Sequence, residues 1–221
     1  MEHLTLVIPA KNEKESLPKV LEELKKFNLK KIVVMEENDT ETLDSIKTFD
    51  CKIIFQNNKG YGDALIQGIR SVKTKYFSIF NADGSFNPNE LHQMYDLLEN
   101  KNIEMVFASR YENGCSSEDD TLITLIGNFI FTKLGNIFFK LKITDILYTY
   151  VVGVTDVFKN LDIQSKDFGF CVELPIKAQK KNYKITTSKS NERARIGGKK
   201  KVNAIRDGFL ILKTMIKLFL K

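Results

Sequence analysis

Residues 77–85 read FSIFNADGS, a β-rich apolar run that ends abruptly on a short polar turn closing at Gly84. In open α/β sheets, ligands bind at the carboxyl edge, where strands end on such turns. Asp83, with its amide neighbour Asn81, could therefore hold a hard divalent cation against a diphosphate. The alternative is a strand followed by an ordinary Asx turn, because Asn, Asp and Gly are common turn residues.

Strand-like and helix-like segments alternate through the first half of the chain. Apolar runs predict the strands and apolar residues at helical spacing predict the helices. The expected strands are 4–8, 31–35, 52–55, 76–80 and 104–108, and the expected helices are 14–27, 41–49, 61–72 and one that begins at Pro88. This alternation predicts an α/β fold with a mostly parallel central sheet flanked by helices.

Polar clusters follow these strands one by one. They are Asn12 with Glu13, residues 36–39, 59–63 and 81–83, and Arg110. Because parallel strands end at the same edge of a sheet, we expect all five clusters to meet there.

The composition narrows the class of partner. A chain of 221 residues with 43% hydrophobic residues suits one α/β domain, and a net charge of +6 favours anionic partners such as nucleotides and phospholipid surfaces. Nucleic acid is not expected, since the chain has neither zinc-finger spacing nor an RNA-binding aromatic signature.

The cysteines and the N-terminus indicate the compartment. Cys51, Cys115 and Cys171 are odd in number and widely spaced, which is typical of reduced thiols in the cytosol. The N-terminus runs straight into a strand without a secretory signal. No uninterrupted apolar stretch reaches the ~18–20 residues of a spanning helix, so we expect a cytoplasmic protein that does not cross a membrane.

The second half is more apolar. Residues 121–142 predict a helix with a wide apolar face and a polar stripe at every fourth residue: Thr124, Asn128, Thr132, Asn136 and Lys140. Such a helix either covers the sheet or contacts a membrane. Residues 148–158 are expected to be extended, 171–181 helical and 183–188 extended.

The C-terminal segment 202–221 predicts an amphipathic helix with a cationic stripe opposite a broad apolar face. This pattern favours a helix in the membrane interface, where Lys and Arg meet anionic headgroups. The alternatives are an oligomer contact or packing on the domain. We therefore expect a main domain over 1–200 and this helix over 201–221.

Five motifs in sequence order resemble family 2 glycosyltransferases, and the last resembles their dolichol-phosphate mannose synthase branch. The motifs are 7–13 (VIPAKNE), 59–65 (KGYGDAL), 80–85 (FNADGS), 108–111 (ASRY) and 195–201 (RIGGKKK). The resemblance covers nearly the whole chain. It implies a GT-A fold, transfer of a sugar from a nucleotide-diphosphate-sugar donor, and Mg²⁺ or Mn²⁺ as cofactor. In that branch the acceptor is a polyprenyl phosphate, or lipid-linked, at the cytoplasmic membrane face.

The resemblance also implies roles for individual residues. Asp83 and Asn81 would bind the metal, and Arg110 and Arg195 would hold phosphate oxygens beside Asp83 as catalytic groups. The remaining substrate-binding residues would be Pro9, Ala10, Asn12, Glu13, Glu36, Gly60, Asp63, Ala82 and Lys201.

The acceptor can be argued from chemistry. A sugar hydroxyl normally needs a positioned general base, whereas a phosphate monoester is already ionised at neutral pH. The carboxylates Glu118, Asp119 and Asp120 could supply a base, so a saccharide hydroxyl in surface-glycan synthesis is the alternative acceptor. A non-catalytic nucleotide-sugar-binding module is a further alternative, since Asn81 and residues 35–39 depart from the family's acidic motifs. Residues 146–148 and Lys200 also depart from its pattern.

Overall fold

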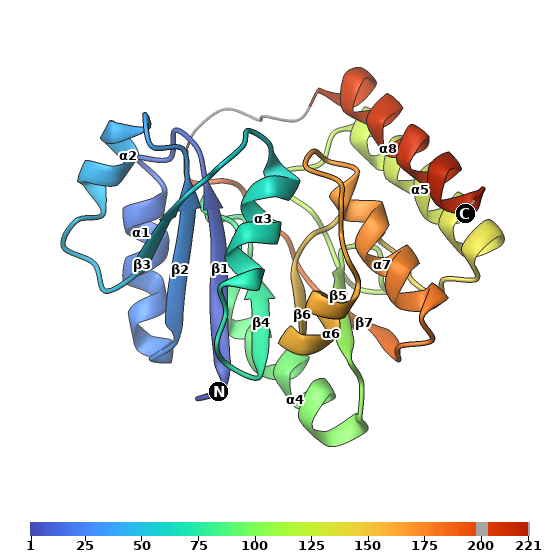
Figure 1. The fold of residues 1–221 in the computed structure, drawn as a ribbon, viewed down its shortest axis with the longest axis horizontal. Helices are drawn as coiled ribbons and strands as arrows, with labels where there is room; N and C mark the ends of the chain where they lie inside the picture. The colour runs from blue at the N-terminus through green and yellow to red at the C-terminus, as the bar shows by residue number, and fades with distance from the viewer. Residues whose placement is uncertain (198–202, 221) are drawn as a thin grey trace.

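A seven-stranded sheet crosses the centre of this computed structural model, which describes residues 1–197 and 203–220 (Figure 1). The strands are β1 (Leu4–Ala10), β2 (Lys30–Met35), β3 (Lys52–Phe55), β4 (Tyr76–Ile79), β5 (Met105–Ser109), β6 (Val151–Val154) and β7 (Ile185–Lys189). The helices are α1 (Leu17–Leu24), α2 (Thr40–Ser45), α3 (Tyr61–Arg70), α4 (Leu91–Lys101), α5 (Leu122–Phe139), α6 (Thr155–Asn160), α7 (Phe170–Lys180) and α8 (Ala204–Phe219), with 3₁₀ turns η1 (Lys25–Phe27) and η2 (Pro88–Glu90).

The strand order is β3-β2-β1-β4-β6-β5-β7, and only β6 runs antiparallel to its neighbours. The predicted α/β fold with a mostly parallel sheet is therefore confirmed. The carboxyl ends of the parallel strands lie together at the upper edge in Figure 1, so the loops that follow them meet there.

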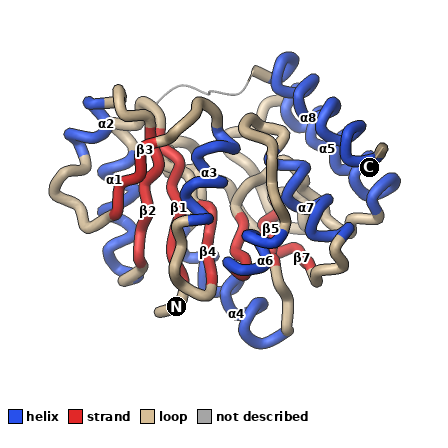
Figure 2. Tube along the Cα trace, viewed as in Figure 1, coloured by secondary structure: helices blue, strands red, loops and turns tan. Residues whose placement is uncertain are grey.

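The period-two alternation of β1 places apolar side chains on both faces of the sheet. Leu6 and Ile8 pack with α1 and α4 on one face, and Val7 packs with α3 and α7 on the other. Figure 2 shows these helices as a layer on each side of the strands. The sheet is thus buried on both faces, as a parallel sheet requires.

The expected extended segment 148–158 is correct only in its first part. After Val154 the chain turns into α6, because β6 has reached the end of its neighbour: Val154 pairs with Tyr76, the first residue of β4. The Thr155 N–H then donates to the Lys75 carbonyl, and the ladder ends.

The polar stripe of α5 faces the protein and its apolar side faces outward. Asn128 and Thr132 are buried, and they accept hydrogen bonds from the backbone N–H groups of Leu147 and Ile146. Within the described residues α5 is also long and apolar enough, by length and composition alone, to span a membrane, although polar residues interrupt its apolar run. The expectation that the chain does not cross a membrane stays a prediction.

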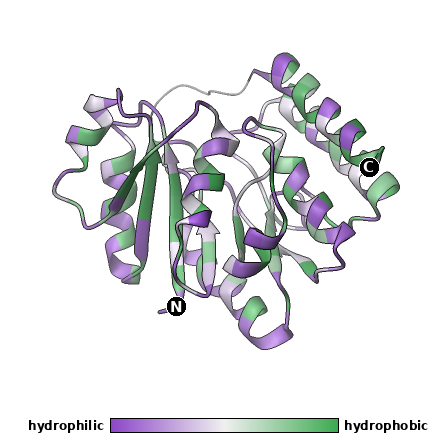
Figure 3. Cartoon of the chain, in the orientation of Figure 1, coloured by the Kyte–Doolittle hydropathy of each residue, from purple (hydrophilic) through white to green (hydrophobic). Residues whose placement is uncertain are grey.

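The C-terminal helix α8 packs on the domain through a single stripe. Ile211, Met215 and Leu218 join α5 and α7 in a third apolar cluster at one end of the sheet. Figure 3 shows apolar segments along α5 and α8, and Figure 1 shows the two helices side by side. The expected domain boundary at 200/201 falls outside the described residues and stays a prediction.

Candidate active site

The turn after β4 carries Asp83 at the carboxyl edge of the sheet. Its Oδ1 accepts hydrogen bonds from the Ser85 backbone N–H (3.0 Å) and the Ser85 hydroxyl (2.8 Å), which fixes the carboxylate in an Asx turn. Gly84 supplies the left-handed φ of +84° that this turn requires. The Asn81 amide nitrogen lies 3.5 Å from Ser85 Oγ, so both predicted metal-binding residues share one serine.

The loop after β1 is fixed to the loop after β2. Asn12 adopts a left-handed conformation (φ 52°), and its N–H donates to Asp39 Oδ2 at 2.6 Å. Glu13 is buried; its N–H donates to the Thr42 hydroxyl, and its carboxylate accepts from Ser16. Asp39 and Thr42 thus shape the predicted nucleotide wall, and the sequence had not singled out Thr42.

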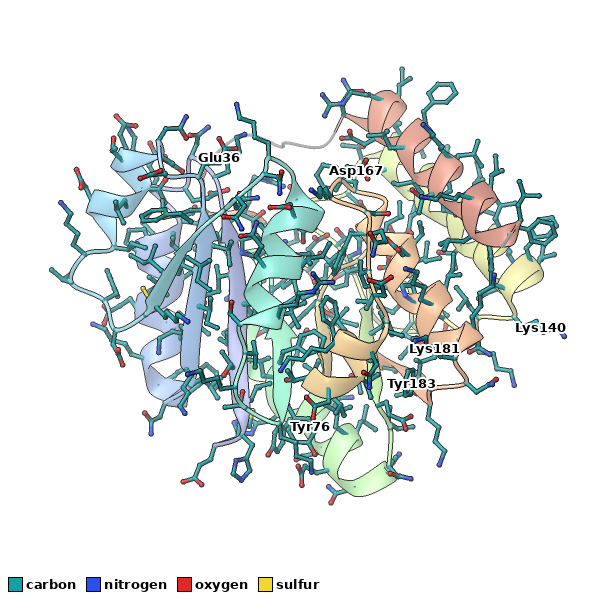
Figure 4. All side chains as sticks on the ribbon, in the orientation of Figure 1. Glu36, Tyr76, Lys140, Asp167, Lys181 and Tyr183 are labelled. Atoms are coloured by element: carbon teal, nitrogen blue, oxygen red, sulfur yellow. The ribbon has the colours of Figure 1, made fainter. Side chains whose placement is uncertain are left out.

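Pro9 and Ala10 form the end of β1, and Ala82 is buried beside Asp83. Glu36 lies just after β2 and accepts a 2.6 Å hydrogen bond from Lys11. Figure 4 shows Glu36 at the upper edge, opposite Tyr76, where β4 begins. These residues occupy the edge expected for the nucleotide.

The start of α3 is covered by the loop before α7. Gly60 has a φ of +128°, and a Cβ there would meet the Lys166 carbonyl oxygen at 2.1 Å, so only glycine fits. The Asp63 N–H donates to that same carbonyl. The Asp63 carboxylate accepts from Asn58 and Gln67, so it fastens the loop before the helix.

A late loop, residues 190–197, lies against the Asp83 turn. The Arg193 N–H donates to the Ser85 carbonyl, and the Ile196 N–H donates to the Asp83 carbonyl at 2.8 Å. Arg195 lies between two acids: Nε and Nη2 bond to Asp119, and Nη1 is 3.7 Å from Asp83 Oδ2. Hydrogen bonding to Asp119 and the charge of Asp83 raise the pKa of Arg195.

The late loop is held at three more points. Arg193 makes a paired salt bridge with Glu23 of α1, at 2.9 and 3.0 Å, and donates to the Phe86 carbonyl. The Ala194 N–H donates to Glu118. Sequence reasoning identified Arg195 but gave no role to Arg193, or to Ser85 at the end of the 80–85 motif. Lys201 lies outside the described residues.

Arg110 is buried in a network of acids. It binds Asp145 through Nε (2.8 Å) and Nη2 (3.1 Å), and its Nη1 donates to Glu192 (3.0 Å) and Asp120 (3.4 Å). Burial raises the pKa of Glu192, although the positive charge of Arg110 acts in the opposite direction. The guanidinium thus joins the ends of three loops, and its predicted contact with donor phosphate stays a prediction.

The acids around Arg110 could not be found by local motif. Asp145 and Glu192 lie 35 and 82 positions from it in the sequence. The only available signal is that an arginine buried at the end of a strand needs compensating charge.

The donor set near Asp83 fits a cation that arrives with its ligand. Within the described residues no group of three or more His, Cys, Asp or Glu side chains is arranged to hold a metal alone. One carboxylate and one amide oxygen are hard donors suited to Mg²⁺ or Mn²⁺, and phosphate oxygens would complete the shell. The residues therefore fit a metal shared with a diphosphate.

The sequence relatives include two archaeal proteins. The chain is 23% identical over 188 residues to the low-salt glycan biosynthesis hexosyltransferase Agl6 of Haloferax volcanii, covering 82% of this chain and 46% of that protein. It is 28% identical over 133 residues to an uncharacterised protein of Methanocaldococcus jannaschii, covering 58% of this chain and 55% of that protein. The chain thus spans about half the length of these relatives.

Among solved structures, the fold is similar to glucosyl-3-phosphoglycerate synthase from Mycobacterium tuberculosis in complex with Mn²⁺, UDP and glucosyl-3-phosphoglycerate. The TM-score is 0.78 at 14% identity, over 97% of this chain and 79% of that one, which shows a shared GT-A fold. The finer dolichol-phosphate mannose synthase branch stays a prediction. Because the model for glycosyl transferase family 2 matches residues 5–162, most of the sequence, the chain belongs to glycosyl transferase family 2.

Proposed function

We propose that this protein transfers a sugar from a nucleotide-diphosphate-sugar to a polyprenyl phosphate at the cytoplasmic face of a membrane, with Mg²⁺ or Mn²⁺ bound beside Asp83. The observation that carries the acceptor and the location is a large apolar surface that begins next to the site. The family membership carries the donor.

The proposed binding site for the sugar-nucleotide donor lies at the carboxyl edge of the sheet. The loops after β1 and β2 would hold the nucleoside, and Asp83 with Asn81 would bind the metal. A bound divalent cation supplies charge neutralisation for the departing nucleoside diphosphate. The similar synthase is described with Mn²⁺ and UDP, which supports this use of the edge. Arg195, 3.7 Å from Asp83, would hold phosphate oxygens when the donor is present.

The choice of a phosphate acceptor is supported by the hydrogen bonds and ion pairs that the nearby acidic side chains already make. Asp119 is paired with Arg195, Glu118 accepts from the Ala194 N–H, and Asp120 accepts from Arg110, Tyr111 and Thr124. A carboxylate whose oxygens are already held by hydrogen bonds and ion pairs is poorly placed to take a proton from an acceptor. An acceptor that is already ionised, such as a phosphate monoester, needs no such base.

The membrane half rests on the outward face of α5 and α8, called here the α5–α8 surface. Its large apolar side chains are between 38% and 78% exposed: Leu122, Ile123, Leu125, Ile126, Phe129, Ile130, Ile137, Phe138, Ile205, Phe209, Leu212, Ile216, Phe219 and Leu220. The Phe138 and Phe219 rings lie 5.5 Å apart, so the two helices form a continuous surface. Apolar patches of this extent mark a surface that binds a partner or a membrane.

Cations border this surface. Arg206, Lys213 and Lys217 follow the same side of α8, and Lys133 lies within the exposed face of α5. Apolar residues flanked by Lys and Arg suit a surface that lies in an anionic bilayer interface. Because α5 begins two residues after Asp120, the membrane would meet the protein beside the active site.

A saccharide hydroxyl is the second candidate acceptor. The observation in its favour is that Asp119 lies next to the same arginine as Asp83, within reach of a sugar bound there. It requires Arg195 to release Asp119 when the donor binds. Replacement of Asp119 with Asn would then abolish transfer while donor binding survives.

The test is release of nucleoside diphosphate from a panel of sugar nucleotides with Mn²⁺, in the presence of undecaprenyl phosphate in detergent. We expect one donor to be consumed only when the lipid is added, with the sugar recovered on the lipid. Consumption with a saccharide and not the lipid would favour the second candidate. Donor binding without turnover in every mixture would favour a non-catalytic module.

A further inference from the structure

A groove with a volume of about 330 Å³ runs along one side of α5. Its outer wall is formed by Leu125 and Phe129, which also belong to the α5–α8 surface, and its inner wall by Tyr111 and Ile143. From Leu125 to Asn136 the helix advances about 16 Å at 1.5 Å per residue. The groove is therefore long and narrow, and it opens beside the apolar surface.

The polar side chains that line the groove are satisfied inside the protein. The Thr132 hydroxyl accepts from the Ile146 N–H, and the Asn136 amide both donates to and accepts from the backbone of Ile143. The Thr144 hydroxyl lies 2.7 Å from Ser109 Oγ and 3.1 Å from Glu112 Oε1, so its single proton is donated to one of these oxygens. Because these groups already have partners, a polar ligand gains little there, and the groove presents methyl and methylene groups to its occupant.

One cation stands at the rim. Lys133 lines the groove, and its ammonium lies 5.5 Å from the centre of the Phe129 ring. A lysine in this position covers apolar surface with its stem and keeps its charge at the solvent. An apolar groove with one cation at its rim suits an amphiphile in a membrane. Its hydrocarbon chain would fill the groove, and the anionic headgroups of neighbouring lipids would lie beside the cation.

The groove ends beside the active site. Tyr111 lies two residues after the end of β5, and its hydroxyl donates to Asp120. The next acid, Asp119, holds Arg195, which faces Asp83. A ligand whose head lies near Asp83 could therefore pass its tail over Tyr111 into the groove.

We propose that this groove binds the first isoprene units of the polyprenyl phosphate acceptor and guides them from the site to the membrane. The proposal rests on the proposed function, since it assigns a subsite to that acceptor. It gives the protein a means to distinguish long prenyl chains from short ones, because only a long chain fills the groove.

Photo-crosslinking tests the subsite without turnover. The probe is a polyprenyl phosphate with a benzophenone on its first isoprene units, bound in detergent and competed with undecaprenyl phosphate. We expect competable adducts at Tyr111, Leu125 and Phe129. Adducts spread equally over the outward residues of α8, such as Ile205 and Phe209, would overturn the subsite.

Kinetics with two acceptors gives a second readout. Leu125→Trp narrows the groove, whereas Phe55→Trp places the same ring at an exposed position on β3, outside both the groove and the α5–α8 surface. We expect Leu125→Trp to raise the KM for undecaprenyl phosphate about tenfold, with the KM for methyl phosphate, which has no prenyl chain, and for the donor nearly unchanged. We expect Phe55→Trp to change none of the three.

The outcomes separate the subsite from the proposed function. Equal effects of Leu125→Trp on the KM of the long and the short acceptor, or no effect on either, would contradict the assignment of the groove as the prenyl subsite. The proposed sugar transfer to the lipid would still stand. If the wild-type protein crosslinks in the groove but glycosylates neither acceptor with any donor, the proposed function fails and the lipid site remains.

Discussion

At the scale of single residues, Asp83 is the group on which the proposed chemistry depends. Asp83→Asn keeps an oxygen for the hydrogen bonds from Ser85 but removes the charge. We expect kcat/KM to fall by about 100-fold or more because the metal loses its anionic ligand. The unfolding free energy should change by less than about 0.5 kcal/mol. Steady-state kinetics and urea unfolding measure the two effects.

A substitution of Asn81 tests the same turn in the opposite direction, by adding a charge. Asn81→Asp adds a second carboxylate at the same turn, so the Mn²⁺ concentration that gives half-maximal activity should fall. If neither substitution alters the dependence on Mn²⁺, the cation does not bind at this turn.

Substitution of Arg110 should act mainly on the stability of the fold. In Arg110→Met, Asp145 and Glu192 stay buried without their cation, which costs about 3–5 kcal/mol. Glu192 already has a raised pKa, and loss of Arg110 raises it further. Because the folded state then binds this proton more tightly than the unfolded state, stability falls as pH rises above about 4.5.

Urea unfolding of Arg110→Met and wild type at about pH 5 and pH 8 measures this dependence. We expect the difference in unfolding free energy between the two proteins to be larger at the higher pH. A pH-independent difference would mean that the network is held by packing against Tyr148, 4.5 Å away, rather than by charge.

At the scale of elements, α8 has two faces with separate roles. Deleting the helix would expose Ile211, Met215 and Leu218. Loss of membrane binding by a truncated protein therefore could not be distinguished from misfolding. The double substitution Phe209→Ser and Ile216→Ser changes only the outward face. Each removes about 1.5–3 kcal/mol of transfer free energy at most, so partition onto phosphatidylglycerol vesicles should fall about tenfold or more.

Phe55→Ser is the control for this experiment, because Phe55 is an exposed aromatic residue on β3, outside the α5–α8 surface. Vesicle sedimentation should show wild-type binding for this variant. Equal losses for Phe55→Ser and the α8 variant would show that overall hydrophobicity, and no particular surface, drives binding.

The same elements show what the sequence could predict. The apolar runs and helical spacing located β1 to β5 and α1 to α4, because local periodicity reports which elements are amphipathic. Periodicity does not report which face of α5 meets the domain. That choice depends on Asp145 and the backbone of Ile146 and Leu147, which lie 14–19 positions after their partners on the helix.

The candidate site was predictable to a similar degree. Residues on strand-end loops, such as Asp83 and Glu13, could be placed because parallel strands end together. The pairing of Arg195 with Asp119 spans 76 positions and depends on how the late loop crosses the sheet edge, which no local pattern encodes.

At the scale of the whole molecule, stability and metal binding should be independent. The fold is held by apolar clusters on both faces of the sheet and a third under α8, and the described residues include no metal cluster that joins elements. Chelation by EDTA should therefore abolish sugar transfer and leave the melting temperature within about 1 °C, since a ligand that does not bind the free protein cannot stabilise it.

Donor and Mn²⁺ together should change the melting temperature of the protein differently from either ligand alone. If the cation is shared between Asp83 and the donor diphosphate, Mn²⁺ without donor leaves the melting temperature unchanged, and Mn²⁺ with the donor raises it by mass action. Calorimetry on four samples (apo, Mn²⁺, donor, and both) measures this coupling. A rise with Mn²⁺ alone would require a site built entirely from protein groups and would exclude the shared-metal arrangement at the Asp83 turn.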